Sequence, residues 1–194
     1  MGESVPQTGL KLTRSIVLIG MMGAGKTAIG RALAAELGVE IRDSDTEIVA
    51  SAQLSIAEIF DRFGEPFFRE KEGQVIARLL EGPPCVLSTG GGAWLSAQNR
   101  EMLMAQASVV WLEGDLNLLW SRVKHKSHRP LLRTEDPKAT LAGLLATRTP
   151  AYALAPAKVT VQPHWSIDRT AAEVMHILRA NGTVVASENA TRAG

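Results

Sequence analysis

The chain has few of the features that mark a secreted, membrane-bound or metal-stabilised protein. It contains one cysteine, Cys85, in 194 residues, which excludes an internal disulfide and a cysteine-rich zinc site. No apolar run approaches the roughly 18 to 20 residues that span a bilayer, and residues 1–14 lack the apolar segment of a signal peptide. Lys and Arg number 21 against 20 Asp and Glu, a net charge of +1, so no overall charge attracts nucleic acid or an anionic membrane. We therefore expect a cytoplasmic protein whose partner binds at a local site.

The composition is that of an ordinary folded domain. Hydrophobic residues make up 45% of the chain and charged residues 21%, proportions that exclude a mostly disordered protein. A domain of this size buries about 70% of its surface, so its core needs no disulfide or metal for stability. Residues 1–12 and 182–194 are polar, small or glycine-containing, which predicts flexible extensions on either side of one domain at residues 13–181.

Short β-branched runs alternate with longer helical patterns along that domain. The expected strands are Ser15–Ile19, Val39–Arg42, Cys85–Ser88, Ser108–Leu112 and Lys158–Val161. Helix start signals occur at Ser55 with Glu58, at Pro66, where a pattern begins that runs to about Leu80, and at Asp115 and Asp136. Apolar strands alternating with helices predict an α/β fold, in which helices cover both faces of a parallel sheet. Ligands of such sheets bind beyond the carboxyl ends of the strands, so the residues that follow each strand are the candidates for a site.

The first expected strand is followed by Gly20-Met21-Met22-Gly23-Ala24-Gly25-Lys26-Thr27, a complete GxxxxGK[ST] pattern. The backbone N–H groups of such a loop surround phosphate oxygens, and the helix beginning near Lys26 adds the positive end of its dipole. In this pattern the lysine reaches the β- and γ-phosphates, and the hydroxyl of Thr27 binds Mg²⁺. Its place between a strand and a helix favours a nucleoside triphosphate site over a glycine-rich turn that matches by chance.

Carboxylates and glycines follow the next two strands. At Asp43-Ser44-Asp45, one carboxylate would hold Mg²⁺ through water and the other would accept a hydrogen bond from a substrate hydroxyl; the alternative is helix capping by Ser44 or Asp45. At Thr89-Gly90-Gly91-Gly92, glycines would let the backbone come close to a ligand; the alternative is a plain loop. The position of both motifs at strand ends favours a binding site.

Two arginines on different helices are candidates for binding an anionic acceptor. Arg69 and Glu72 are spaced i, i+3, and the aromatic residues 67–68 are expected to face the core, which would leave Arg69 at the rim of a cleft. Residues 70–71 fit a solvated face. Arg148 lies near the end of another helix, where the dipole favours a cation. Each arginine alone fits a structural role, but a pair of arginines can bind a carboxylate through paired N–H groups.

Residues 122–133 contain five Lys or Arg, two His and no acidic residue. A solvated loop is one interpretation, and an RNA-binding patch is disfavoured because no aromatic residues interleave for base stacking. In a phosphoryl-transfer enzyme such a segment would form a lid that closes on the triphosphate and brings an arginine to the developing charge. Arg129, directly before Pro130, is the candidate arginine.

Together these motifs resemble the shikimate kinase family from about Leu12 to Ala180. The matching segments are GMMGAGKT at 20–27, DSD at 43–45, FR with a following glutamate at 68–72, GGGA at 90–93, RPLL at 129–132 and RxPxY at 148–152. The resemblance implies a three-layer α/β/α fold with a five-stranded parallel sheet, a substrate-binding segment and a mobile lid at about residues 122–134. It also implies MgATP-dependent phosphorylation of the shikimate 3-hydroxyl, in the route to chorismate and the aromatic amino acids. The expected protein is a monomer with no nucleic-acid or membrane partner.

The resemblance further implies a role for each matching residue. Shikimate would be bound by Asp45, Arg69, Gly90, Gly91, Gly92 and Arg148, with the arginines on its carboxylate. ATP would be bound by Gly23, Ala24, Gly25, Lys26, Thr27 and Ala28, with Arg122 stacked on adenine and Arg129 reaching the phosphates. Thr27 would ligate Mg²⁺ and Asp43 would support it. The catalytic set would be Lys26, Asp45 and Arg129, with Asp45 orienting the attacking hydroxyl or accepting its proton.

The segment at residues 162–166 departs from the family's adenine-contacting loop, so the residue that closes that side of the nucleotide site is not identified. Two other functions are weighed against this one. Another small P-loop kinase, such as a gluconate kinase, is disfavoured by the combination of DSD, GGG and two arginines. A nucleotide-binding regulatory module without catalysis should lack Lys26, Asp45 or Arg129, and all three are present.

Overall fold

The structure, a computed structural model, describes residues 9–125 and 130–187. In these residues the elements are β1 (Leu10–Leu12), β2 (Ser15–Ile19), α1 (Lys26–Leu37), β3 (Ile41–Asp43), α2 (Ser44–Ala52), α3 (Ile56–Leu80), β4 (Val86–Ser88), the 3₁₀ helix η1 (Ala93–Leu95), α4 (Ala97–Gln106), β5 (Ala107–Glu113), α5 (Leu116–Val123), the 3₁₀ helix η2 (Pro130–Leu132), α6 (Pro137–Tyr152), β6 (Ala157–Thr160), α7 (Ile167–Ala180) and β7 (Val184–Ala186).

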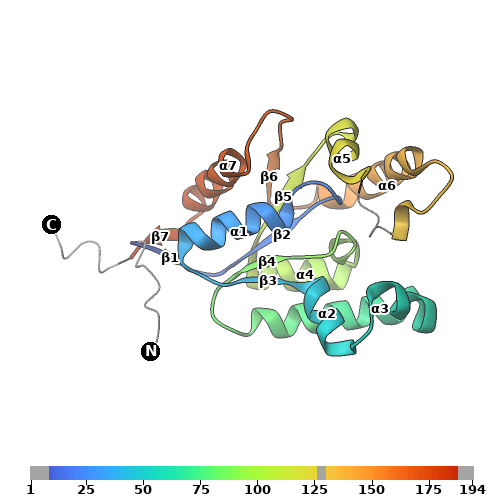
Figure 1. Cartoon of the computed structure of the whole chain (residues 1–194). Coiled ribbons are helices and arrows are strands. Elements are labelled where there is room, and N and C mark those ends of the chain that lie inside the picture. Colours follow the sequence, from blue (N-terminus) through green and yellow to red (C-terminus); the bar gives the residue numbers. More distant parts are fainter. Residues whose placement is uncertain (1–8, 126–129, 188–194) are drawn as a thin grey trace, which may run out of the picture.

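Five of the strands form one parallel sheet in the order β3-β4-β2-β5-β6. The register places Ile16 of β2 opposite Val86 of β4 and Ser108 of β5. Helices α1 and α7 pack side by side on one face, and α3 and α4 lie on the other (Figure 1). The predicted α/β architecture with a five-stranded parallel sheet is confirmed. Because the strands run in one direction, their carboxyl ends and the loops that follow them share one edge of the sheet.

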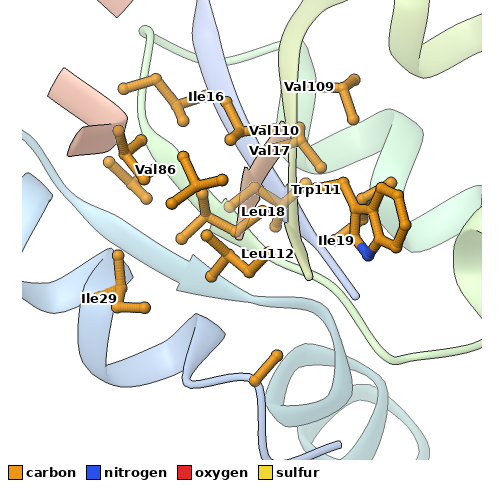
Figure 2. Close-up of a cluster of buried hydrophobic side chains, with 14 of the residues drawn as sticks. Ile16, Val17, Leu18, Ile19, Ile29, Val86, Val109, Val110, Trp111 and Leu112 are labelled. Carbon is orange, nitrogen blue, oxygen red and sulfur yellow. The ribbon is translucent and has the colours of Figure 1, made fainter. Parts of the chain in front are cut away.

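The core is built around β2, the central strand. Every residue of this strand is buried, and its four apolar side chains, Ile16–Ile19, are at most 1% exposed. Figure 2 shows these side chains among those of the flanking strands, including Val86, Val110 and Leu112, with Ile29 of α1 nearby. A strand that packs helices against both faces has no solvated side, which explains its uninterrupted apolar sequence.

The structure extends the domain at both ends relative to the sequence interpretation. β1 pairs antiparallel with β7, placing Leu10 opposite Ala186 and Leu12 opposite Val184. Leu12 and Val184 are buried, so apolar burial stabilises this short pair. Residues 10–12 and 184–186 therefore belong to the folded domain, whereas the sequence interpretation assigned them to flexible extensions.

The second expected strand also begins later than predicted. Gly38 ends α1 in a left-handed conformation, with φ of 64°, and the N–H of Val39 donates to the carbonyl of Ala34. Val39 thus completes the end of the helix, and the strand starts at Ile41 rather than at Val39.

The long helix α3 consists of two helical segments that meet at Gly64. Gly64 has φ of 79° and ψ of 171°, a backbone conformation that residues other than glycine rarely adopt. Pro66 follows in the first turn of the second segment, which ends at Leu80 as expected. The capping box of Ser55 and Glu58 at the start of the first segment is confirmed.

Helix α2 and both segments of α3 contribute to a small apolar cluster apart from the main core. Its buried members are Ile48, Ile59 and Phe68. The expectation that both aromatic residues 67 and 68 face the core is wrong for Phe67, which is 37% exposed against 3% for Phe68. Consecutive residues of an α-helix point about 100° apart, so only one of the two can face the cluster.

Other local predictions agree with the structure. Asp115 caps α5 and Asp136 caps α6 through their carboxylates, and Cys85 is a buried free thiol. Among the described helices, none combines the length and apolarity that crossing a membrane requires.

Candidate active site

The loop between β2 and α1, residues 20–27 (the phosphate loop), turns tightly at the carboxyl edge of the sheet. Gly23 has φ of 86°, and a methyl group on it would lie 2.9 Å from the carbonyl oxygen of Leu119. Neither the conformation nor the space admits another residue. Gly25 precedes the first residue of α1, so the N–H groups of the first helical turn open toward the cleft beside the loop.

Lys26 and Thr27, the last residues of the phosphate loop, contact the ends of neighbouring strands. The ammonium of Lys26 donates to the carbonyls of Gly20, at 2.9 Å, and Met21, at 3.2 Å. The hydroxyl of Thr27 lies 3.4 Å from Oδ2 of Asp43 and 3.4 Å from Oγ of Ser88. One oxygen from the first turn of α1 and two from the ends of β3 and β4 therefore meet beside the loop, and hard oxygen donors are what Mg²⁺ requires.

Asp43 also begins the next helix. Its Oδ1 accepts hydrogen bonds from the N–H groups of Asp45, at 3.1 Å, and Thr46, at 3.3 Å. The capping role that the sequence offered to Ser44 or Asp45 thus belongs to Asp43, because the strand extends to this residue before α2 begins. Ser44 is fully buried and its hydroxyl accepts from the N–H of Gly90, at 3.3 Å.

The second segment of α3 carries an arginine and a buried glutamate. Nη1 of Arg69 donates to Oε2 of Glu72 at 2.8 Å, and Nη2 donates to Oε1 of Glu65 at 3.0 Å. The Glu72 side chain is 0% exposed, whereas that of Glu65 is 63% exposed. Burial opposes the charge of Arg69, but the two carboxylates raise its pKa above its ordinary value.

Glu72 is held in an environment that disfavours its charge. Burial raises the pKa of Glu72 to about 7, although the Arg69 guanidinium lowers it, and the charge of Asp45 adds to the increase. Its Oε1 has no hydrogen-bond partner within the described part of the chain. A buried oxygen without a donor is costly, so this atom marks a place where a polar ligand group would be stabilised.

Residues 90–92 (the glycine loop) pass directly beneath these side chains. A methyl group on Gly90 would lie 2.7 Å from Oδ1 of Asp45 and 2.9 Å from Oε1 of Glu72, and one on Gly92 would overlap the guanidinium of Arg69. The glycines therefore allow three charged side chains to pack against the backbone of one loop. The interpretation of this segment as a plain loop does not explain that packing.

Arg148 reaches the same loop from α6. It is 8% exposed, and its Nη1 would lie 3.4 Å from a methyl group on Gly91. One helical turn later, the hydroxyl of Tyr152 donates to the carbonyl of Gly91 at 2.5 Å. α6 thus contacts the glycine loop at Gly91, whereas Arg69 contacts it at Gly92.

One open cleft of about 1430 Å³ connects these groups. Of the predicted site residues that the structure describes, those lining it are Gly23, Gly25, Lys26, Thr27, Ala28, Asp43, Asp45, Arg69, Gly90, Gly91, Gly92, Arg122 and Arg148. Ala24 is fully buried and does not line the cleft. Arg122 lies over the phosphate loop, with its Nη1 3.3 Å from the carbonyl of Gly23. Arg129 lies outside the described residues, so its lid role stays a prediction, although Leu131 and Arg133 beyond it line the cleft.

Several lining residues were not identified as site residues by the sequence interpretation, and two groups of them bear on the chemistry of the cleft. Ser166, Ile167 and Thr170, at the start of α7, line the cleft together with Arg122 and the phosphate loop. The N-cap serine before a helical pattern was the available signal, since Ser166 caps α7. The sequence interpretation named Glu72 only as the glutamate that follows Phe68 and Arg69, and gave it no role in the site. Its i, i+3 spacing from Arg69 predicted contact, but not its burial.

Comparison with known proteins is consistent with this geometry. A family model described as "Shikimate kinase" matches residues 22–179. The chain is 53% identical over 174 residues to the shikimate kinase of Ruegeria pomeroyi, covering 90% of this chain and 89% of that protein. It is 58% identical over 153 residues to the shikimate kinase of Cereibacter sphaeroides, covering 79% and 77% respectively.

A solved structure is similar to this chain in both fold and sequence. It is a shikimate kinase from Acinetobacter baumannii in complex with shikimate, 37% identical, with a TM-score of 0.82, covering 87% of this chain and 94% of that one. Since the family model spans most of the chain and the two relatives match over 89% and 77% of their length, the chain belongs to the shikimate kinase family.

Proposed function

We propose that this kinase transfers the γ-phosphoryl group of ATP to the 3-hydroxyl of shikimate, in the route to chorismate and the aromatic amino acids. The observation that carries the proposal is the single cleft in which the phosphate loop faces Asp45, Arg69 and Arg148. A triphosphate at one end and a hydroxylated carboxylic acid at the other would meet between Lys26 and Asp45. Phosphoryl transfer depends mainly on such positioning and on charge neutralisation.

On the donor side, the phosphate loop and the start of α1 would bind the phosphates, with Lys26 toward the β- and γ-groups. Thr27 and Asp43 would hold Mg²⁺, the first directly and the second through water. When bound, Mg²⁺ would neutralise phosphate charge. One or two protein oxygens beside the substrate phosphates are the usual protein contribution to a Mg²⁺ site, and Thr27 with Asp43 fits that description.

On the acceptor side, Arg69 and Arg148 would bind the carboxylate from two directions. Their N–H groups can pair with both of its oxygens, and Arg69 is held in place by Glu72 and Glu65. Asp45 would accept a hydrogen bond from the attacking hydroxyl. As the new O–P bond forms and the bond to the ADP oxygen breaks, Asp45 would take the hydroxyl proton. Oε1 of Glu72, which has no hydrogen-bond partner among the residues that the structure describes, offers an acceptor for a second hydroxyl.

On the adenine side, Arg122 and the first turn of α7 would enclose the base. Arg122 crosses the phosphate loop, and Ile167, at 51% exposure, presents an apolar surface to the same cleft. A guanidinium plane and an aliphatic side chain are suitable for the two faces of a purine. Because one chain supplies the donor and acceptor sides of the cleft, we further propose a monomer. The compartment that we propose is the cytoplasm, as the sequence composition led us to expect.

The proposal is tested by ADP release with three acceptors: shikimate, gluconate and a nucleoside monophosphate. We expect turnover with shikimate that disappears when Mg²⁺ is chelated, and at most background release with the others. Turnover with gluconate would favour the alternative that the protein is a gluconate kinase. MgADP binding without turnover on any acceptor would favour the regulatory module.

A further inference from the structure

Tyr152 has no part in the proposed chemistry, yet its hydroxyl lies at the junction of the two substrate sites. It is the single tyrosine of the chain and is 0% exposed. Its hydroxyl donates to the carbonyl of Gly91 at 2.5 Å and lies 3.9 Å from the sulfur of Met21 in the phosphate loop. Its ring stacks on Trp111 of β5 with a centroid distance of 6.0 Å.

The hydroxyl is not needed to fill space, because phenylalanine has nearly the same shape. A buried hydroxyl costs free energy unless it is hydrogen-bonded, so its presence indicates that the bond to Gly91 contributes something that packing does not. Burial raises the pKa of Tyr152, against the opposing charge of Arg148. The phenol therefore keeps its proton and remains a donor.

The bond to Gly91 restrains a segment with little stiffness of its own. Three consecutive glycines have no side chains to fix their backbone. In a planar trans peptide the carbonyl of Gly91 and the N–H of Gly92 point in opposite directions. Holding that carbonyl therefore also sets the direction of the Gly92 N–H, at the residue that packs under Arg69.

The same bond fixes α6 relative to the glycine loop. Arg148 lies one turn before Tyr152, and both side chains approach Gly91, with Arg148 Nη1 at 3.4 Å and Tyr152 Oη at 3.7 Å from a methyl group placed on it. A second bond, from Nε1 of Trp94 to the carbonyl of Ala151 at 2.7 Å, joins the helix to the turn that follows the loop. The position of Arg148 over the acceptor side therefore depends on these two hydrogen bonds between α6 and the segment at residues 91–94.

We propose that Tyr152 is a positioning residue for the acceptor: its hydroxyl holds the Gly91–Gly92 peptide and the Arg148 turn in the arrangement that binds shikimate, without touching shikimate itself. This inference rests on the proposed function, in that it takes the glycine loop and Arg148 as parts of the acceptor site. It assigns Tyr152 an effect on acceptor affinity and none on the transfer step.

The test is the variant Tyr152→Phe, with Thr149→Val as matched control. Thr149 lies on the same helix, and within the described residues its hydroxyl bonds to the carbonyl of Leu145 of that helix, at 2.7 Å. Loss of one buried hydrogen bond should raise the KM for shikimate about three- to tenfold in Tyr152→Phe, with kcat and the KM for ATP within about twofold of wild type. Thr149→Val should leave all three unchanged. An unchanged KM for shikimate in Tyr152→Phe, or an equal change in the control, overturns the proposal.

A second measurement uses the unaltered sequence. Because the chain has one tyrosine, replacement of tyrosine by 3-fluorotyrosine gives one ¹⁹F resonance, from position 152. The resonance should move when shikimate is added, and a resonance that stays in place at saturating shikimate overturns the inference. Wild-type protein that does not phosphorylate shikimate would instead refute the proposed function, and the inference with it.

Discussion

The buried carboxyl of Glu72 should make the stability of the protein depend on pH in a direction opposite to that of most paired carboxylates. Its pKa lies at about 7 in the folded protein, against an ordinary value of 4.5. Between these two values the folded state binds more protons than the unfolded state, so stability falls as the pH rises. The contribution is fully present below pH 4.5 and is lost as the pH passes through 7.

The size of the effect follows from the shift. Each pKa unit corresponds to 1.36 kcal/mol, so the rise in the pKa of Glu72 amounts to about 3 kcal/mol, of which about 2 to 3 kcal/mol falls between pH 5 and pH 8. That is a large part of the 5–15 kcal/mol that typically stabilises a folded protein.

The assay compares wild type with Glu72→Gln by urea denaturation at pH 5, 6, 7 and 8. The glutamine keeps the shape and the hydrogen bond to Arg69 but cannot ionise. The difference in unfolding free energy, wild type minus variant, should therefore decrease by about 2 to 3 kcal/mol across this range, while all other titrating groups cancel. Glu65→Gln is the matched control: it removes the charge of the exposed partner of the same arginine, and an exposed ion pair contributes at most about 1 kcal/mol.

Two results would refute this reasoning. A difference between wild type and Glu72→Gln that stays constant from pH 5 to pH 8 would mean that the carboxyl titrates outside the range. A difference that grows with pH would mean that the attraction of Arg69 outweighs burial. In either case the electrostatic description of the acceptor side would need revision.

Further measurements probe individual residues of the cleft. Asp45→Asn should lower kcat by roughly 10²- to 10⁴-fold while calorimetry shows unchanged MgADP affinity; a near-normal rate would exclude Asp45 from proton transfer. Arg148→Ala should raise the KM for shikimate roughly ten- to a hundredfold, since a charged hydrogen bond contributes about 1.5–3 kcal/mol, and an unchanged KM would contradict the carboxylate site. Gly92→Ala should displace the Arg69 guanidinium and raise the same KM. Combined with Arg69→Ala it should add little, whereas a fully additive double mutant would show that Gly92 acts elsewhere.

The parts of the site that are contiguous in sequence could be predicted. Eight consecutive residues specify the phosphate loop, and its conformation depends on its own glycines and on the strand and helix beside it. The DSD and GGG motifs were placed correctly because parallel strands end at one edge. The sequence did not identify Asp43 as the residue that caps α2. That identity depends on the residue at which β3 ends, and strand ends are the least certain feature of a sequence interpretation.

What could not be predicted depends on contacts between distant segments. Glu72 is buried because it packs against the glycine loop close to Asp45. The sequence could not reveal this, since a charged i, i+3 pair on a helix is more often solvated. The pairing of β1 with β7 joins residues more than 170 positions apart, and three-residue strands have no periodicity to detect. Ile167 enters the cleft only because α7 begins where the sheet ends.

The pairing of β1 with β7 brings Gly9 and Ser187 together in a way that permits a covalent connection between them. The N–H of Ser187 donates to the carbonyl of Gly9 at 2.8 Å, and the pair lies away from α2, α3 and α5 (Figure 1). A two-residue turn such as Asn-Gly, joining Ser187 to Gly9 in place of residues 1–8 and 188–194, would convert the pair into a hairpin. New termini opened in the exposed turn at residues 81–84 would then give a circular permutant. Its catalytic groups would keep their places although their order along the chain had changed.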